Sequence, residues 1–409
     1  MASINFDQVA ADAMLKQMYD APAMVDLSYS DRPFFALVNK RGGEGGNGVK
    51  VPLAIATSQG FAPTIAQAQA VLAAQDLEAF VVTPVVLLSV ARISGLTLES
   101  SMSSKQAFAK GAKMVIDAAV KRLANAVSSG LFRDGSGAIG TIASIGAGPN
   151  YVITLSNPAD IVQFELNQAV QAVSTGGVLR AGTGYVISVN RSAGTLQVAN
   201  ALGGPAASPT GFAATDSLIT AGTQNLQIRG LGAWLTPNNL STPFFGVVRT
   251  KDETRLAGVT YDGSALSVKD AIVNAVNLVA REGGKPDYVF MNFESYTQLL
   301  QDLQSNVIYT SLEGPQKISF SGVVFQGPKG AITCVPDRDC PPQEAFLLQL
   351  DSWMLLHAND GESVFLDDNG VGQVFRTVES YDGREVRVKF YGNLACNAPG
   401  FNARVRLSA

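Results

Sequence analysis

The sequence predicts an α+β fold divided into several lobes, and three features indicate this class. An amphipathic helix covers 103–132, strand-like segments precede it at 49–56 and 77–93, and helices alternate with short strands after residue 267. A chain of 409 residues exceeds the capacity of one typical hydrophobic core. We therefore expect two or three lobes, and no internal repeat is visible in the sequence.

Residues 1–40 predict an arm that cannot build a core alone. A loose apolar stripe over 5–19 indicates a helix, and Pro22 and Pro33 favour extended backbone beyond it. The glycine-rich tract 41–48 then forms a flexible joint, because glycine leaves the backbone nearly free. A phosphate-binding loop is not expected here, since the tract lacks the Lys-Ser/Thr ending and precedes a strand.

Residues 41–98 predict a long two-stranded ribbon. Apolar residues alternate over 49–56, the segment 77–93 is β-branched and apolar, and an Ala/Gln-rich tip joins them. Pro52 and Pro84 fall inside these strands, which suits strands with an unpaired edge. A ribbon of this kind is marginal in water by itself, so it needs a supporting surface. That support is either its own domain or a neighbouring subunit.

The clearest helix covers 103–132 and dominates the region 99–137. One face is predicted to be buried, because apolar residues recur at three- and four-residue spacing: Phe108, Ala112, Val115, Ile116, Ala119, Leu123 and Val127. The other face carries Lys110, Lys113, Asp117 and Lys121, which most simply face solvent and only weakly indicate phosphate contact. About 28 residues at about 1.5 Å each predict a rod of roughly 40 Å. The turn at 134–137 ends it.

Residues 138–228 predict an inserted β-rich domain. The segment is rich in Gly, Ala, Ser and Thr and carries few charges. Strand-like runs at 185–189 and 195–199 are joined by a turn, and 164–173 is predicted as a short helix.

The remaining chain returns to an α+β pattern. Over 229–362 we predict an amphipathic helix at 267–282, a buried strand at 287–292 and a helix at 294–303, followed by strands. Residues 363–409 predict closing strands. Hairpin turns are expected at the Asp-Gly and Asn-Gly pairs 360–361, 369–370 and 382–383.

Composition argues against several functional classes. The net charge is −4, the pI is near 5.2 and no run of Lys and Arg is longer than two, unlike a dedicated nucleic-acid binder. Only 16% of the residues are charged, against about 25% in an ordinary chain, so much of the surface suits contact with copies of the same chain. We expect no secretory signal, since no basic region precedes an apolar stretch at the start. The longest apolar run, 80–91, is too short to cross a bilayer. We expect synthesis in a cytoplasm and no membrane partner.

The histidine and the cysteines do not form a recognisable reactive site. His357 is the only histidine and lies in a strand-like run, where it is more often structural than the base of a nucleophile pair. Cys334, Cys340 and Cys396 cannot all pair, and they supply too few neighbouring soft ligands for a metal.

Two carboxylate pairs complete the search for chemistry. Asp337/Asp339 and Asp367/Asp368 lie on predicted turns, where such pairs usually face solvent, and neither has the spacing of a calcium-binding loop. We therefore predict that the protein is not an enzyme and has no catalytic residue, no metal ligand and no cofactor.

Several stretches carry a resemblance to a known family. They are 131–137 (LFRDGSG), 243–247 (PFFGV), 251–258 (KDETRLAG), 286–303, and 337–342 (DRDCPP) with the strand that ends near 351–353. Together with the order of the parts, these stretches resemble the major capsid proteins of tailed bacteriophages, which share the Hong Kong phage-type capsid fold. The resemblance covers nearly the whole chain.

The resemblance implies names for the predicted parts. They are an N-arm at 1–40, an E-loop at 41–98, the spine helix and start of the P-domain at 99–137, an inserted β-rich domain at 138–228, an A-domain with P-domain parts at 229–362, and closing P-domain strands with the C-terminus at 363–409. The inserted domain departs from the minimal plan of the family.

The resemblance also implies a structural function. Copies would form pentamers and hexamers that close into the icosahedral shell, or head, of a virion around phage double-stranded DNA. The implied partners are the chain itself, a separate scaffolding protein, the portal and a cement or decoration protein, while DNA is contacted weakly and without sequence preference. The E-loop and N-arm would lie on adjacent subunits. Two other classes stay open: an encapsulin-like compartment shell, which shares the fold, and a β-rich phage surface or adhesin component.

Overall fold

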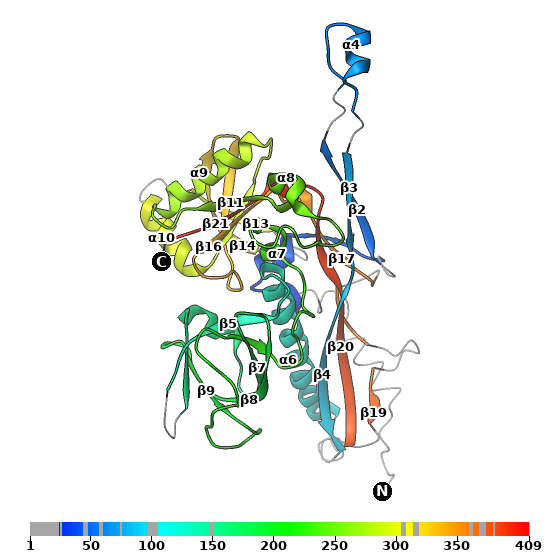
Figure 1. Cartoon of the computed structure of the whole chain (residues 1–409). Helices are drawn as coiled ribbons and strands as arrows, with labels where there is room; N and C mark the ends of the chain where they lie inside the picture. The colour runs from blue at the N-terminus through cyan, green and yellow to red at the C-terminus, as the bar shows by residue number, and fades with distance from the viewer. Residues whose placement is uncertain are drawn as a thin grey trace.

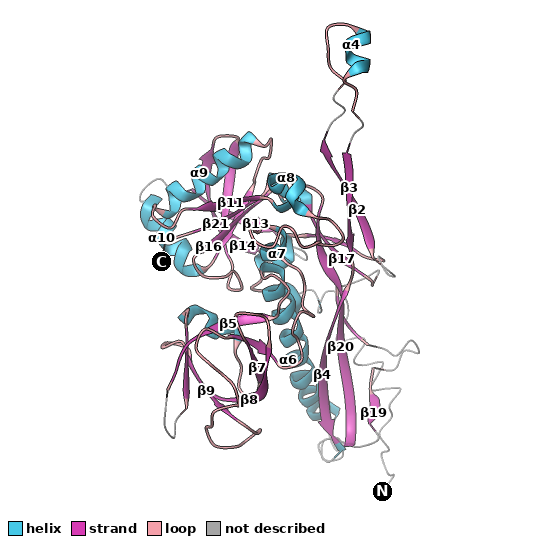
Figure 2. Cartoon of the chain, viewed as in Figure 1, coloured by secondary structure: helices cyan, strands magenta, loops and turns pink. Residues whose placement is uncertain are grey.

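The structure is a computed structural model that describes residue 24 and residues 27–43, 48–56, 60–73, 76–95, 105–146, 151–303, 308–313, 319–359, 363–367, 374–378 and 381–408. The expected helix at 5–19, the centre of the glycine-rich tract and the turns at 360–361 and 369–370 lie outside these residues. Figure 1 shows a lobe of sheet and helices, a small barrel below it, a long helix beside extended strands, and a ribbon that projects from the body. The mixture of helices and strands in Figure 2 confirms the α+β class. None of the described helices is long and apolar enough to span a bilayer.

A sheet built around one long strand packs against the spine helix, and the name P-domain is kept below for these two elements. Its centre is β20 (Tyr381–Cys396), which pairs with β4 (Val85–Ser94) and, at successive positions, with β19 (Arg376–Val378), β18 (Val364–Leu366) and β17 (Trp353–His357). The short β1 (Asn39–Arg41) runs parallel to β17. Residues 382–383, expected to form a turn, lie inside β20, because ten β4 pairings continue through Gly383.

The spine helix α6 (Lys105–Phe132) packs on β4 and β20, as Figure 1 shows. The predicted length and the inward-facing positions Ile116, Ala119, Leu123 and Val127 are confirmed, whereas Val115 is exposed. Close to the C-terminal end of α6 lies the short helix α7 (Leu231–Trp234), all of whose residues are buried. The aromatic core beside this junction includes Phe132, Trp234 and Trp353.

The A-domain is a mixed sheet with helices on it. Its described strands follow the order β11 (Val259–Asp262), β21 (Ala403–Arg406), β16 (Glu344–Leu348), β12 (Tyr288–Met291), β15 (Gly330–Pro336), β14 (Ser319–Gly327) and β13 (Ile308–Glu313). Helix α9 (Val268–Arg281) buries Ile272, Ala275, Val276 and Val279 completely, and α10 (Phe293–Leu303) packs beside it. The helices and strands expected over 267–303 are therefore confirmed. Shorter helical turns are α8 (Glu253–Ala257), Arg249–Lys251, Leu350–Ser352 and Pro399–Phe401.

The inserted region forms a closed barrel with its own core. The strand order is β10 (Ser217–Thr220), β5 (Ala138–Ile145), β6 (Val152–Leu155), β9 (Thr195–Ala199), β8 (Leu179–Asn190) and β7 (Ala169–Val173). The helix expected at 164–173 is wrong, because Val170 and Ala172 alternate inward as part of β7 and only Pro158–Gln163 makes a helical turn. Pairing with β8 and β10 on either side holds these residues as a strand, in which side chains alternate between the two faces.

The E-loop divides between two sheets. Its ribbon consists of β2 (Val49–Ala56) and β3 (Asp76–Val82), and α4 (Ile65–Ala70) lies at the tip. The second run, 77–93, is not one strand: it breaks at Thr83 and Pro84, after which β4 joins the P-domain sheet. Pro84, which has no N–H to donate, thus separates two strands and does not lie within one. The tip helix was not expected from the sequence, although Thr64 caps it by accepting from the Gln67 backbone N–H.

Candidate assembly surfaces

The tip of the E-loop exposes large apolar side chains far from the body of the subunit. Phe61 is 93% exposed and Ile65 is 79% exposed, and residues 60–73 contain no charged side chain. Figure 1 shows α4 at the far end of the projecting ribbon. Exposing a patch of this kind in water is unfavourable, so the tip is a candidate contact surface.

The root of the E-loop, in contrast, is fixed to its own subunit. Phe80 is completely buried against Trp234, with ring centroids 4.9 Å apart. The Val81 N–H donates to Phe245 O at 2.9 Å, and Lys251 forms an ion pair with Glu78. The sequence left open whether the ribbon rests on its own domain or on a neighbouring subunit. The root of the E-loop packs on its own domain, whereas the described residues of its tip make no contact of that kind.

The outward face of β4 carries a second apolar surface. Leu87, Ala91 and Ile93 point inward, whereas the alternate residues Val86 and Leu88 are more than half exposed and Val90 nearly half. The residues directly opposite on β20 are Tyr391, Lys389 and Arg387. Val86, Leu88 and Val90 thus form an apolar stripe on the face of the sheet that points away from α6, and Lys389 and Arg387 lie beside it.

The end of the N-arm is held by a buried polar junction. Tyr29, Phe34 and Phe35 are almost completely buried, and Tyr29 Oη lies 2.9 Å from Ser363 Oγ. Arg32 and Arg338 both donate to Asn125 Oδ1 on the spine helix, at 2.5 and 2.8 Å. Three separate parts of the chain therefore meet at one amide oxygen.

The carboxylates of Asp337 and Asp339 belong to the same junction. Both are buried, so the expectation that they face solvent is wrong. Asp337 Oδ2 accepts from the Phe34 N–H at 3.1 Å, and its Oδ1 accepts from the Asp339 N–H at 2.9 Å. Burial, followed by the charge of Asp339, raises the pKa of Asp337 to about 7. Burial likewise lowers the pKa of Arg32, against the opposing effect of Asp339.

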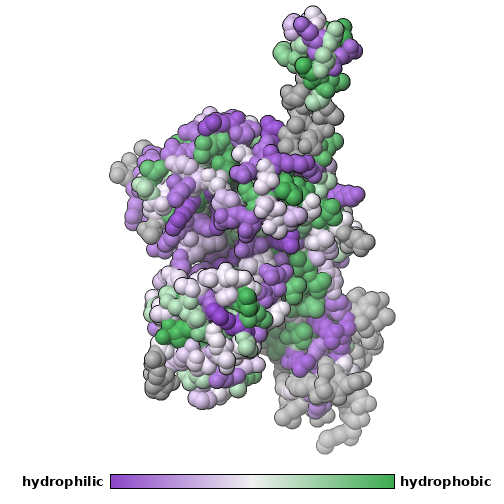
Figure 3. Space-filling view, in the orientation of Figure 1, coloured by the Kyte–Doolittle hydropathy of each residue, from purple (hydrophilic) through white to green (hydrophobic). Residues whose placement is uncertain are grey.

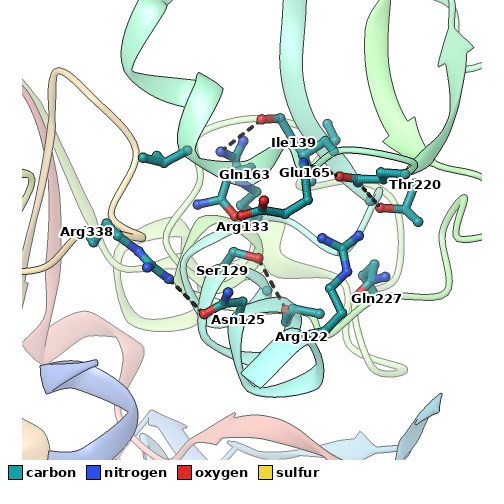
Figure 4. A pocket seen from close by; sticks show the side chains of 17 residues that line it. Arg122, Asn125, Ser129, Arg133, Ile139, Gln163, Glu165, Thr220, Gln227 and Arg338 are labelled. Atoms are coloured by element: carbon teal, nitrogen blue, oxygen red, sulfur yellow. Dashed lines mark hydrogen bonds between the residues drawn. The ribbon is translucent and has the colours of Figure 1, made fainter. Parts of the chain in front are cut away.

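The barrel meets the body through polar contacts around a small pocket. The pocket holds about 50 Å³, room for a few water molecules, between α6 and the barrel. Figure 4 shows Arg122, Asn125 and Ser129 on the α6 side and Gln163 and Glu165 on the barrel side. Burial lowers the pKa of Arg122, and the Glu165 carboxylate opposes this effect.

Two polar pairs join the barrel to the body around that pocket. Arg133 pairs with Asp160 at 2.9 Å, and Gln163 Nε2 donates to Asp339 Oδ1 at 3.1 Å. The barrel core is a separate apolar cluster from the main core. The barrel is therefore attached by hydrogen bonds and ion pairs and not by a shared core.

Cys396, on the strand paired with that of His357, does not lie beside the histidine. Cys396 lies opposite Trp353, four residues along the strand from His357, which is a separation of roughly 13 Å. Burial raises the pKa of Cys396 to about 12, and it also raises the pKa of Cys334 and Cys340 above the usual thiol range. These thiols stay protonated near neutral pH.

The remaining carboxylate pair, Asp367/Asp368, is described in the structure only at Asp367. Asp367 is buried and forms ion pairs with Arg376 and Lys389, so it does not face solvent as expected, and Asp368 lies outside the described residues. In the part of the chain that the structure describes, no group of three His, Cys, Asp or Glu side chains could hold a metal ion.

Comparison with known proteins agrees with the fold. The chain resembles the capsid of cyanophage A-1(L), with 11% identity, 92% of each chain covered and a TM-score of 0.52. A family model described as SU10 major capsid protein matches residues 209–377, which include most of the A-domain and part of the P-domain sheet. This match and the capsid fold together support a tailed-phage major capsid protein.

Two further structures similar to this chain have lower TM-scores. The SrpI encapsulin of Synechococcus elongatus PCC 7942 is 9% identical over 98% of this chain and 96% of that one, with a TM-score of 0.46. The chain of Mycobacterium phage Bobi is 9% identical over 99% of both chains, with a TM-score of 0.43. No curated protein matches the sequence significantly.

Proposed function

We propose that this major capsid protein assembles, as pentamers and hexamers, into an icosahedral shell that encloses phage double-stranded DNA. The exposed apolar tip of the E-loop is the observation that carries the proposal, because a projecting element with Phe61 and Ile65 in water gains free energy only by covering another surface. The stripe Val86, Leu88 and Val90 is a surface of matching chemistry on a neighbouring copy.

The parts of the subunit have distinct proposed roles. The N-arm (1–40) and E-loop (41–98) reach neighbouring subunits, while residues 29–38 and the root of the E-loop hold them to their own subunit. The spine helix region (99–137), the A-domain region (229–362) and the closing strands (363–409) form the wall. The inserted domain (138–228) decorates the shell. The chain has no catalytic or cofactor role in this proposal. A separate scaffolding protein, the portal and a cement or decoration protein are its further partners, and DNA is contacted weakly and without sequence preference.

Substitution of the E-loop tip tests the proposal. Phe61→Ser combined with Ile65→Ser should leave the subunit soluble, with an unchanged melting temperature, because neither side chain is packed on the body. Particle yield, measured by sedimentation and electron microscopy of the expressed chain with its scaffolding partner, should fall by about tenfold or more.

A barrel variant provides the matched control. Val178→Ser with Leu202→Ser removes two apolar side chains of 66% and 64% exposure from the inserted domain. This control should assemble normally. Wild-type particle yield from the tip variant, at equal expression, would refute the role assigned to the E-loop.

A further inference from the structure

An open cleft of about 710 Å³ lies between the beginning of the barrel, α7 and the A-domain. Figure 3 shows the surface hollowed between the A-domain lobe and the barrel, with mostly hydrophilic walls. Four arginines line the cleft: Arg133, Arg229, Arg249 and Arg404. Two of them are neutralised, because Arg133 pairs with Asp160 and Arg404 pairs with Glu344. Asp134 also lines the cleft, so the two remaining arginines exceed its one further carboxylate and leave the cleft with a positive charge.

Arg249 and Arg229 have no carboxylate partner among the residues that the structure describes. Arg249 is only 3% exposed, and its Nη1 donates to Ala233 O and Trp234 O at 2.8 and 3.2 Å. Its Nε is buried without a hydrogen-bond partner. Burial, and then the nearby charge of Arg229, lower the pKa of Arg249 to about 10. The guanidinium remains charged near neutral pH, and its charge is not compensated.

Two aromatic rings hold these guanidinium groups in place. Arg249 lies 4.3 Å from the ring centroid of Phe244, and Arg229 lies 5.0 Å from that of Phe245. A guanidinium on an aromatic face keeps N–H donors at its edge for another partner. Phe245 also adopts a left-handed backbone conformation, with φ of 47°, which is costly for a bulky side chain.

The shape and chemistry of the cleft distinguish between anionic partners. Duplex DNA is usually bound by a stripe of cations that follows its phosphates. Here two uncompensated cations lie in a concave site beside Pro243, Pro341 and Phe244. This combination suits a peptide that carries carboxylates next to apolar side chains. We propose that the cleft binds an acidic peptide segment of a partner chain, with Arg229 and Arg249 donating to its carboxylates.

Such binding would also act on the root of the E-loop. Phe245 O accepts from the Val81 N–H, and the Phe80 and Phe244 rings are 6.3 Å apart. A ligand that orders the 244–247 turn therefore stabilises the end of β3. The proposal concerns the single subunit and stands or fails independently of shell assembly.

Calorimetric titration of the full-length, unassembled chain tests the proposal. The probe is a short peptide that alternates glutamate and leucine, and its reference is the same peptide with glutamine. We expect the glutamate peptide to bind about tenfold or more tightly than the glutamine peptide. Arg229→Glu should abolish this preference, whereas Arg229→Lys should retain part of it, because lysine keeps the charge but not the planar donor edge.

Arg281→Glu is the matched control, since Arg281 is exposed at the end of α9, away from the cleft, and its reversal changes the net charge equally. It should leave peptide binding unchanged. Hydrogen exchange of the Val81 amide should slow when the glutamate peptide is bound. Equal binding of both peptides, loss of binding in Arg281→Glu, or tighter Arg229-dependent binding of duplex DNA or tripolyphosphate would overturn the proposal.

Discussion

Asp337 shows how a single buried side chain links distant parts of this molecule. Its carboxylate accepts backbone N–H bonds from the arm residue Phe34 and from Asp339. The charged groups that act on Asp337 are Asp339, which disfavours its ionisation, and Arg338, which favours it, while Arg32 interacts with Asp337 and Asp339 from the arm. Because burial is the largest influence, ionising Asp337 weakens the junction that fixes the arm.

This arrangement predicts that stability falls as the pH rises. The pKa of Asp337 is raised to about 7 in the folded chain, whereas an unfolded aspartate titrates near 3.9. The folded state therefore binds the Asp337 proton more tightly than the unfolded state does. The contribution of this proton to the free energy of unfolding is complete below about pH 4 and is lost as the pH rises through about 7. The loss should be on the order of a few kcal/mol.

Urea unfolding of the unassembled chain at about pH 5 and about pH 8 measures this effect. In Asp337→Asn the side chain cannot ionise, so the decrease in unfolding free energy between the two pH values should be smaller than in the wild type. Asp134→Asn removes an exposed carboxylate and serves as the control. Identical pH dependence in the wild type and Asp337→Asn would contradict the assignment.

At the scale of elements, Gly230 determines how closely α7 approaches the end of the spine helix. Its N–H donates to Arg133 O at 3.0 Å. A Cβ at this position would lie 2.2 Å from Leu131 O and 2.3 Å from Gly130 O. Both are backbone atoms of the spine helix, so the clash cannot be relieved by a side-chain rotation.

Gly230→Ala is therefore expected to separate α7 from α6. We expect it to lower the free energy of unfolding by about 3 kcal/mol or to prevent soluble expression, as over-packing of a fixed backbone contact does. Gly176→Ala is the control, because the nearest atom to its Cβ would be Ser174 Oγ at 3.9 Å, and it should change stability by less than about 0.5 kcal/mol. Equal urea midpoints for the two variants would show that the contact at Gly230 does not matter.

At the scale of the whole molecule, the barrel is joined to the body through two adjacent connecting segments. The Asn225 N–H donates to Ser136 O at 3.0 Å, and a Cβ on Gly137 would lie 2.9 Å from Thr223 O. The two connections are thus in direct contact, and the barrel core does not merge with the main core. This geometry favours an independently folding insertion.

Replacing residues 138–220 with a short glycine-serine linker tests that independence. The shortened chain should remain soluble and assemble, with a lower melting temperature because the Arg133–Asp160 and Gln163–Asp339 contacts are lost. Residues 138–220 expressed alone should give a folded domain with dispersed amide resonances. Aggregation of the shortened chain together with an unfolded isolated barrel would show that the two parts fold as one.

Local periodicity in the sequence was sufficient to predict several elements. The spine helix, strand 49–56 and helix 267–282 were placed within two residues of their bounds in the structure, because their patterns of apolar residues are strong and continuous. The resemblance to capsid proteins rested on the order of these elements, and the family match confirms it.

Other features depended on contacts between residues far apart in the chain. The run 77–93 is apolar throughout, and only its two different partners, β2 and β20, determine that it breaks at Pro84. Residues 169–173 become a strand because β8 and β10 lie on either side of them. Burial of Asp337 needs a backbone N–H donor from Phe34, 303 positions earlier. Sequence periodicity records which face of an element is apolar, whereas pairing, burial and pKa depend on the neighbour that the fold supplies.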